Sequence, residues 1–236
     1  MANRRNILMG TGAAALVAVA GTAYYLVAKP ETAIAEDAAT PAAGAVPAPA
    51  PGATFDVAKL LTPAGDYKDH FEGGADAKVV IIEYLSPTCP HCAAFANDVF
   101  PQLKAAYIDN SKIKFIPRPF MRNVLDAVVF MLAEAAGEAK YHEVVATFFK
   151  TQDQWAASQT PNDAIFAIAQ QLGFTKETYD AALKNQTLFA SLEKVRDQAL
   201  DEFKLQGTPT FYINGKMLTG ESSLEALKAE IDPLLA

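Results

Sequence analysis

The sequence has little cysteine, little histidine and no excess of positive charge. Its two cysteines, Cys89 and Cys92, are too close together for a structural disulfide framework, which needs distant cysteines that close long loops. The 20 lysines and arginines are outnumbered by 27 aspartates and glutamates, and the net charge of -7 argues against nucleic-acid binding. His70 and His142 lack the spacing of metal ligands, and Ala93 stands where a haem-attachment motif needs histidine. We therefore expect no nucleic-acid partner, no metal and no cofactor.

The N-terminus has a pattern typical of exported proteins. Arg4 and Arg5 precede an uncharged apolar run over residues 7–28, and residues 33–35 (AIA) fit a signal-peptidase site. The run approaches the ~20 residues that cross a bilayer, so residues 1–35 are a cleaved signal peptide, which we favour, or a retained anchor. Both alternatives place the remaining chain in the periplasm, because positive charge stays on the cytoplasmic side. The paired arginines are compatible with general or twin-arginine export.

A flexible linker is predicted to follow this N-terminal segment. Residues 36–53 are rich in alanine and proline and have no apolar periodicity. Such a segment cannot bury enough surface to offset the entropy lost on ordering. We expect the folded part of the chain to begin at residue 54.

The two cysteines lie between a predicted strand and a predicted helix. Residues 78–85 (KVVIIEYL) form a continuous β-branched and apolar run, which is typical of a strand covered on both faces. Cys89 is then a plausible helix N-cap, with Pro90 at the first helical position, where its missing N–H costs nothing. The helix is predicted to continue to about residue 108, and residues 112–116 (KIKFI) predict a second strand.

The middle of the chain is predicted to be entirely helical. Between residues 120 and 203 apolar side chains recur at helical spacing, and no strand pattern interrupts them. Thr160 and Pro161 mark one helix start with a cap residue followed by a proline in the first turn.

The strand pattern returns near the C-terminus. Residues 209–213 and 216–218 are separated by Asn214-Gly215, a turn of the hairpin type. Ser222 and Glu225 then form a capping-box pattern that predicts a last helix.

This order of elements resembles the thioredoxin fold, and the helical block within it resembles the DsbA branch. The motif Cys89-Pro90-His91-Cys92 carries the dipeptide typical of that branch, Glu83 lies six residues before the first cysteine, and Thr208-Pro209 stands where the family has a cis-proline loop. The resemblance implies an α/β thioredoxin fold, over residues 54–119 and 204–236, with an inserted all-helical domain over residues 120–203.

The position of the dithiol predicts how each thiol behaves. A helix N-terminus stabilises a thiolate through unpaired N–H groups and the helix dipole, so Cys89 is the expected nucleophile. Cys92, one turn further in, is expected to be buried and to act as the resolving thiol. The His91 ring is expected to add positive charge or a hydrogen bond near Cys89, which would lower the thiol pKa and make the disulfide a stronger oxidant.

Two further positions allow more than one interpretation. Glu83 is an acid in an apolar strand, where burial would raise its pKa and suit it to exchange a proton with Cys92; alternatively, it reaches solvent at the strand end. Thr208-Pro209 is an ordinary strand start or, as the resemblance implies, a cis-proline facing the dithiol, with the preceding backbone free to pair with an extended client. We favour the functional interpretation for both.

The resemblance implies a monomeric, exported dithiol oxidase that transfers a disulfide from Cys89 and Cys92 to cysteine-containing client proteins. A DsbB-like membrane quinone reductase would reoxidise it. An isomerase or reductase on the same scaffold is the nearest alternative, although residues 54–77 are too short for the dimerisation domain of DsbC-like isomerases. The alternative from another class is a tethered peptide-binding or chaperone module in which the dithiol is secondary.

Overall fold

The computed structural model describes residue 50, residues 52–219 and residues 223–236, which belong to one compact unit. The predicted signal or anchor segment (residues 1–35) and most of the predicted linker (residues 36–53) lie outside these described residues. None of the helices in the described part has the length and hydropathy needed to cross a bilayer.

A five-stranded mixed sheet forms the centre of the described unit. Its strands are β1 (Glu72–Gly73), β2 (Val79–Leu85), β3 (Ile113–Pro119), β4 (Thr210–Ile213) and β5 (Lys216–Thr219). The spatial order is β1-β3-β2-β4-β5; β2 and β3 are parallel, and the other neighbours are antiparallel. The central strand β2 therefore has partners on both edges, as its continuous apolar sequence predicts.

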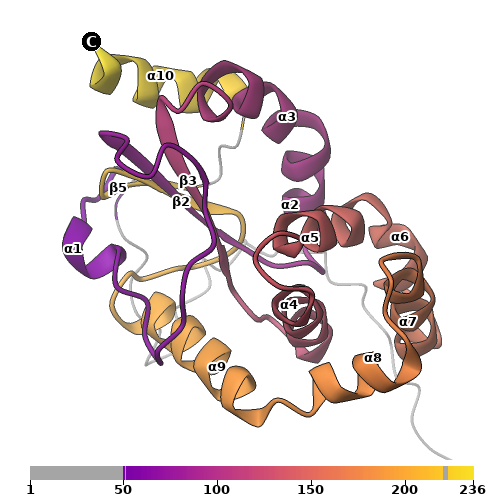
Figure 1. Ribbon diagram of the computed structural model, residues 1–236. Coiled ribbons are helices and arrows are strands. Elements are labelled where there is room, and N and C mark those ends of the chain that lie inside the picture. The colour runs from indigo at the N-terminus through magenta and orange to yellow at the C-terminus, as the bar shows by residue number, and fades with distance from the viewer. Residues whose placement is uncertain (1–49, 51, 220–222) are drawn as a thin grey trace, which may run out of the picture. The chain divides into compact units, whose positions relative to one another are not determined.

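Helices cover both faces of this sheet (Figure 1). One face packs against the helical run after Cys89 and against α10, and the other against the helices between β3 and β4. The first set comprises α2 (Pro90–Ala94), η1 (Phe95–Val99), α3 (Phe100–Leu103), η2 (Lys104–Ile108) and α10 (Leu224–Leu235). The second comprises α4 (Val124–Ala136), α5 (Tyr141–Lys150), α6 (Gln152–Trp155), α7 (Pro161–Gln171), α8 (Lys176–Leu183) and α9 (Gln186–Asp201). This is the predicted α/β fold with an all-helical insert.

The side chains of β2 alternate between the two faces of the sheet. Val79 and Ile81 pack with the helical run after Cys89, whereas Ile82 and Tyr84 pack with the inserted helices. Because successive side chains of a strand point to opposite faces, Glu83 shares the face of Ile81. Its carboxyl group therefore lies on the side of the sheet from which the dithiol helix starts.

The helix after Cys89 reaches residue 108 as predicted, but it is not a regular α-helix. The π-helical segments η1 and η2 interrupt it. Pro101 has no N–H to donate to the carbonyl of Asn97, and its ring would clash with that carbonyl in a regular α-helix. A π-helical segment just before Pro101 avoids both problems.

Several other elements differ from the sequence-based expectation. The unpatterned residues 54–77 contain a short helix, α1 (Val57–Leu60), as well as β1. Helix α10 has Ser223 as its N-cap, one residue after the predicted Ser222, which lies outside the described residues. Thr160 is an N-cap as predicted, but its side chain accepts no capping hydrogen bond; Pro161 and the acidic Asp163 in the first turn mark that helix start.

A buried ion pair ties the segment before the sheet to β3. Arg118 is 0% exposed; its Nε donates to Asp69 Oδ1 at 2.8 Å, and its Nη2 also pairs with this carboxylate. Its Nη1 donates to the carbonyl of Leu60 at 2.6 Å and to the hydroxyl of Tyr84 at 3.0 Å. A buried charge is tolerated only when it is paired and hydrogen-bonded, as it is here.

Replacing one partner of this ion pair should destabilise the fold strongly. Asp69→Ala leaves the guanidinium buried without its counter-charge, so the free energy of unfolding should fall by about 3–5 kcal/mol in urea denaturation. The more exposed pair of Lys216 and Glu230 provides a control, because Glu230→Ala should cost less than about 1 kcal/mol. Equal losses in the two variants would contradict a structural role for the Arg118 pair.

Candidate active site

The two cysteines are held where β2 passes into α2. Cys89 is the N-cap of α2 with extended backbone dihedrals (φ -85°, ψ 119°), and Pro90 occupies the first turn. The side chains of Cys89 and Cys92 are 3% and 0% exposed, and both are free thiols in this structure. The sequence therefore positions the dithiol as predicted, at the start of a helix that follows the central strand.

Cys89 has an unusually acidic thiol. A hydrogen bond from the Cys92 thiol is the largest influence; it outweighs burial, and the pKa of Cys89 is lowered to about 5. Thr208 and the main-chain N–H groups of Cys92 and His91 lower it further. The N–H groups at the start of a helix have no intrahelical partner, which makes them available to a thiolate at the N-cap.

The pKa of Cys92 is shifted in the opposite direction. Burial raises its pKa, and so do its hydrogen bond to Cys89 and the nearby charge of Glu83. One thiol therefore ionises readily while the other keeps its proton.

The structure shows no hydrogen bond between the His91 ring and Cys89. His91 is exposed, and within the described residues its ring makes no hydrogen bond or ion pair. The predicted contribution of His91 comes instead from its main-chain N–H. The influence expected of the side chain is thus supplied by the backbone of α2.

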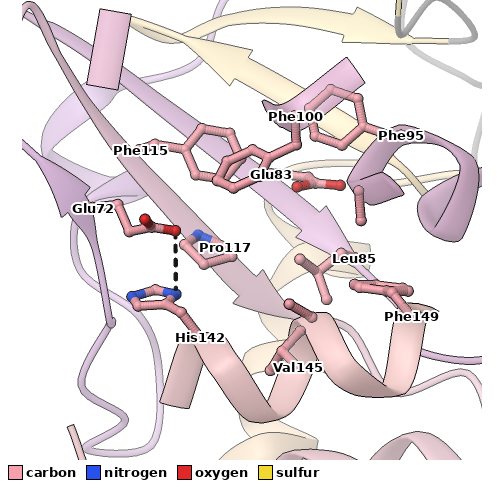
Figure 2. Close-up of a pocket in the computed structure, with 12 residues that line it drawn as sticks. Glu72, Glu83, Leu85, Phe95, Phe100, Phe115, Pro117, His142, Val145 and Phe149 are labelled. Carbon is pink, nitrogen blue, oxygen red and sulfur yellow. Dashed lines mark ion pairs between the residues drawn. The ribbon is translucent and has the colours of Figure 1, made fainter. Parts of the chain in front are cut away.

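Glu83 is buried, which excludes the alternative that it reaches solvent. It is 3% exposed, and its carboxyl group faces a cavity of about 60 Å³. Figure 2 shows the rings of Phe95, Phe100 and Phe115 close to this carboxyl group. Burial, and then the charge of Cys89, raises the pKa of Glu83 well above its usual range. Burial thus favours the protonated form of Glu83, close to Cys92.

The opposite end of the same cavity carries a second polar pair. Nδ1 of His142 lies 3.8 Å from Oε1 of Glu72, as the dashed line in Figure 2 marks. Both side chains of this pair are partly exposed, and Val145 and Phe149 of α5 line the same cavity. The inserted helices therefore help to keep water from Glu83.

The loop before β4 faces Cys89. The peptide bond between Thr208 and Pro209 is cis, and the carbonyl of Thr208 accepts a hydrogen bond from the Cys89 thiol at 3.2 Å. The Thr208 hydroxyl is buried and has no hydrogen-bond partner among the described residues. The structure thus brings Cys89, Cys92, Glu83, Thr208 and Pro209 to one place.

The sequence analysis missed two residues that hold the loop before Cys89. Asp126 accepts hydrogen bonds from Ser86 and Thr88, and Gln152 donates to the carbonyls of Pro87 and Cys89. The capping box that Asp126 forms with Asn123 leaves a visible sequence pattern, whereas nothing in the sequence marks Gln152. In the described part of the chain no group of three or more His, Cys, Asp or Glu side chains could hold a metal ion.

Comparisons with known proteins agree with this arrangement. A family model described as thioredoxin matches residues 66–233. A Rickettsia bellii protein, provisionally described as a protein-disulfide oxidoreductase, is 33% identical over 171 residues. This match covers 71% of the chain and 64% of that protein, so the chain spans less than two thirds of its relative.

Two solved structures are similar to the chain. Alpha-DsbA1 from Wolbachia pipientis has a TM-score of 0.69 and 23% identity, over 76% of this chain and 96% of that one. A protein-disulfide isomerase from Novosphingobium aromaticivorans has a TM-score of 0.64 and 25% identity, over 74% of this chain and 99% of that one. Because the family match covers most of the chain, the chain belongs to the thioredoxin family, and its fold with the helical insert is similar to that of DsbA structures.

Proposed function

We propose that this chain is a protein thiol:disulfide oxidoreductase that transfers a disulfide from Cys89 and Cys92 to cysteine-containing client proteins. The observation that carries the proposal is the difference between the two thiols. The pKa of Cys89 is lowered to about 5, whereas burial raises that of Cys92. A stable thiolate at Cys89 favours the reduced enzyme, and therefore favours transfer of the disulfide to the client.

The reaction would proceed through a mixed disulfide at Cys89. A client thiolate attacks Sγ of Cys89, the bond to Cys92 breaks, and its electron pair goes to Cys92. A second client thiolate then attacks the client sulfur of the mixed disulfide, and Cys89 leaves as a thiolate. The client loses two electrons as its disulfide forms, and the enzyme gains them as a dithiol.

Glu83 would supply the proton that the first step requires. A buried thiolate at Cys92 is unfavourable, so Cys92 is a poor leaving group unless it is protonated as the bond breaks. Glu83 keeps its proton because burial raises its pKa. In the reverse reaction the resulting carboxylate would take the proton from Cys92.

Thr208 and Pro209 would contact the client. When the Cys89 thiol is protonated, the Thr208 carbonyl accepts its hydrogen. Cys89 has no S–H as a thiolate or in the mixed disulfide, so in both states this carbonyl lacks the thiol donor. A main-chain N–H of an extended client segment can replace it, as in other cases where peptides pair with exposed backbone.

The enzyme would act as a monomer in the periplasm and be reoxidised by a DsbB-like membrane quinone reductase. The N-terminal pattern of Arg4, Arg5 and the apolar residues 7–28 supports export. An exported dithiol oxidase needs a membrane partner of this kind, because its disulfide is consumed in each cycle. Isomerase activity is a second candidate, since a protein-disulfide isomerase is among the similar structures.

Single substitutions of the two cysteines should separate their roles. Cys89→Ser should abolish disulfide transfer to a reduced client, because Cys92 then has no partner with which to form the disulfide that the client attacks. With a client that already carries a disulfide, Cys92→Ser should accumulate a mixed disulfide, because Cys89 attacks the client disulfide and no resolving thiol remains to release it; non-reducing electrophoresis would detect it. Full client binding and function in Cys89→Ser would favour the peptide-binding module instead.

The complexes trapped by Cys92→Ser in intact cells also test the partners. Exported clients and a membrane quinone reductase are the expected species. Complexes with cytoplasmic proteins alone would contradict the proposed location.

The direction of electron flow should follow the acidity of Cys89. We expect a reduction potential well above the about -270 mV of thioredoxin, measured against glutathione. Because the folded pKa of Cys89 is lowered, its thiolate stabilises the reduced protein fully above the ~8.5 of an unperturbed thiol. This stabilisation should disappear as the pH falls through about 5.

Urea denaturation of the reduced and oxidised forms across this pH range measures the effect. The free energy of unfolding of the reduced form, relative to that of the oxidised form, should rise between these two pH values. A potential close to that of thioredoxin would overturn the assignment as an oxidase and leave the reductase or isomerase alternative.

Glu83→Gln should slow the steps in which Cys92 gains or loses a proton. Glutamine has the size of glutamate but no transferable proton, so disulfide transfer should slow by about 10²-fold. Stopped-flow measurement with a reduced peptide gives the rate. Glu72→Gln changes a carboxylate at the far end of the same cavity and should leave this rate unchanged. Equal rates in the two variants would exclude Glu83 from proton transfer.

A further inference from the structure

The loop that presents Cys89 is held by side chains from the inserted helices. Asp126, in the first turn of α4, is 0% exposed and accepts a hydrogen bond from the Ser86 hydroxyl at 2.9 Å. It also accepts from the main-chain N–H groups of Thr88 at 2.8 Å and Arg122 at 2.7 Å. Asp126 thus fixes the beginning of the loop on the side of α4.

Gln152 fixes the end of the loop, next to the nucleophile. It is the first residue of α6, is 8% exposed, and reaches the loop with its side-chain amide. Its Nε2 donates to the carbonyl of Pro87 at 2.7 Å and to that of Cys89 at 3.0 Å. The contact to Cys89 is made at the N-cap residue itself.

The Cys89 carbonyl is a sensitive place for such a contact. It also accepts the first helical hydrogen bond of α2, from the N–H of Ala93 at 3.0 Å. The orientation of this carbonyl sets the orientation of the peptide that joins Cys89 to Pro90, and hence the position of Sγ relative to the free N–H groups of α2. In addition, the amide of Gln152 places the positive end of its dipole beside Cys89.

We propose that Gln152 is a positioning residue for disulfide exchange, which holds the N-cap at Cys89 so that the N–H groups of α2 converge on its sulfur. Gln152 does not touch the reacting sulfur; it acts through the carbonyls of Pro87 and Cys89. The proposal rests on the proposed function, in which Cys89 is the nucleophile. It assigns to the helical insert a part in the redox chemistry itself.

Two substitutions and a control distinguish positioning from packing. Gln152→Met keeps the approximate volume but removes the donor, whereas Gln152→Ala removes the volume as well. Gln154→Met makes the same change at an exposed site in the same short helix. Positioning predicts that both Gln152 variants raise the Cys89 pKa equally, by about half a unit or about threefold in the ionisation constant. Packing predicts a loss of stability in the alanine variant and no shift in either.

The Cys89 pKa is measured in the full chain from the ultraviolet absorbance of the thiolate against pH. The rate of reaction of the reduced protein with oxidised glutathione provides a second readout, and urea denaturation reports stability. In both Gln152 variants the rate at a pH below the Cys89 pKa should fall about threefold, in step with the thiolate fraction. The Gln154→Met control should match the unmodified chain.

The outcomes separate this inference from the proposed function. If the unmodified chain has no acidic thiol, the proposed function fails. If it has one and the Gln152 variants match Gln154→Met in pKa and rate, only the positioning role is overturned. Failure of both Gln152 variants to fold would also overturn it, because Gln152 would then belong to the folding core.

Discussion

The thiolate of Cys89 can exist in an almost water-free position only because hydrogen-bond donors converge on its sulfur. With the side chain 3% exposed, burial disfavours the charge, and the Cys92 thiol and the main-chain N–H groups of α2 must outweigh it. These donors are in place because the helix starts directly at Pro90. The end of β2 and the loop that follows place Cys89 at the start of α2, where these donors lie. The loop before β4 places the carbonyl of Thr208 against the same sulfur, where it accepts a hydrogen bond from the protonated thiol.

Two buried carboxyl groups near the dithiol show how surroundings decide the role of a residue type. Asp126 accepts hydrogen bonds from a hydroxyl and from several main-chain N–H groups, which satisfies a carboxylate and ties the loop to α4. Glu83 instead faces a small cavity lined largely by aromatic and aliphatic side chains, and burial raises its pKa. The first group is held in place by donors, whereas the second keeps a proton that it can transfer. The sequence alone does not distinguish these two roles. Glu83 lies within the apolar run of β2, and Asp126 lies in the first turn of α4.

Local signals in the sequence predicted the elements that depend on chain neighbours. The apolar run predicted β2, Pro90 predicted the start of α2, and Asn214-Gly215 predicted the hairpin, whose two turn residues have φ of 44° and 89°. Contacts across long separations left no such signal: Gln152 reaches the Cys89 carbonyl across 63 residues, and Arg118 reaches Asp69 across 49. Helix α8 lies within the block predicted to be helical, and a capping box at Thr175 marks its start. The expected role of the His91 ring stays a prediction, because the motif fixes its place in the chain but not its contacts.

The inserted helices influence both thiols, and this changes how the motif at residues 89–92 should be interpreted. Val145 and Phe149 of α5 line the cavity that Glu83 faces, and the charge of Glu83 is one of the influences that raise the pKa of Cys92. Asp126 and Gln152 hold the loop from which Cys89 meets the donors of α2. The difference in acidity between the two thiols is therefore a property of the motif together with its covering helices. If the same motif packed against different helices, its two thiols would have different pKa values. Burial and the geometry of hydrogen-bond donors set a thiol pKa more strongly than the sequence of the motif does.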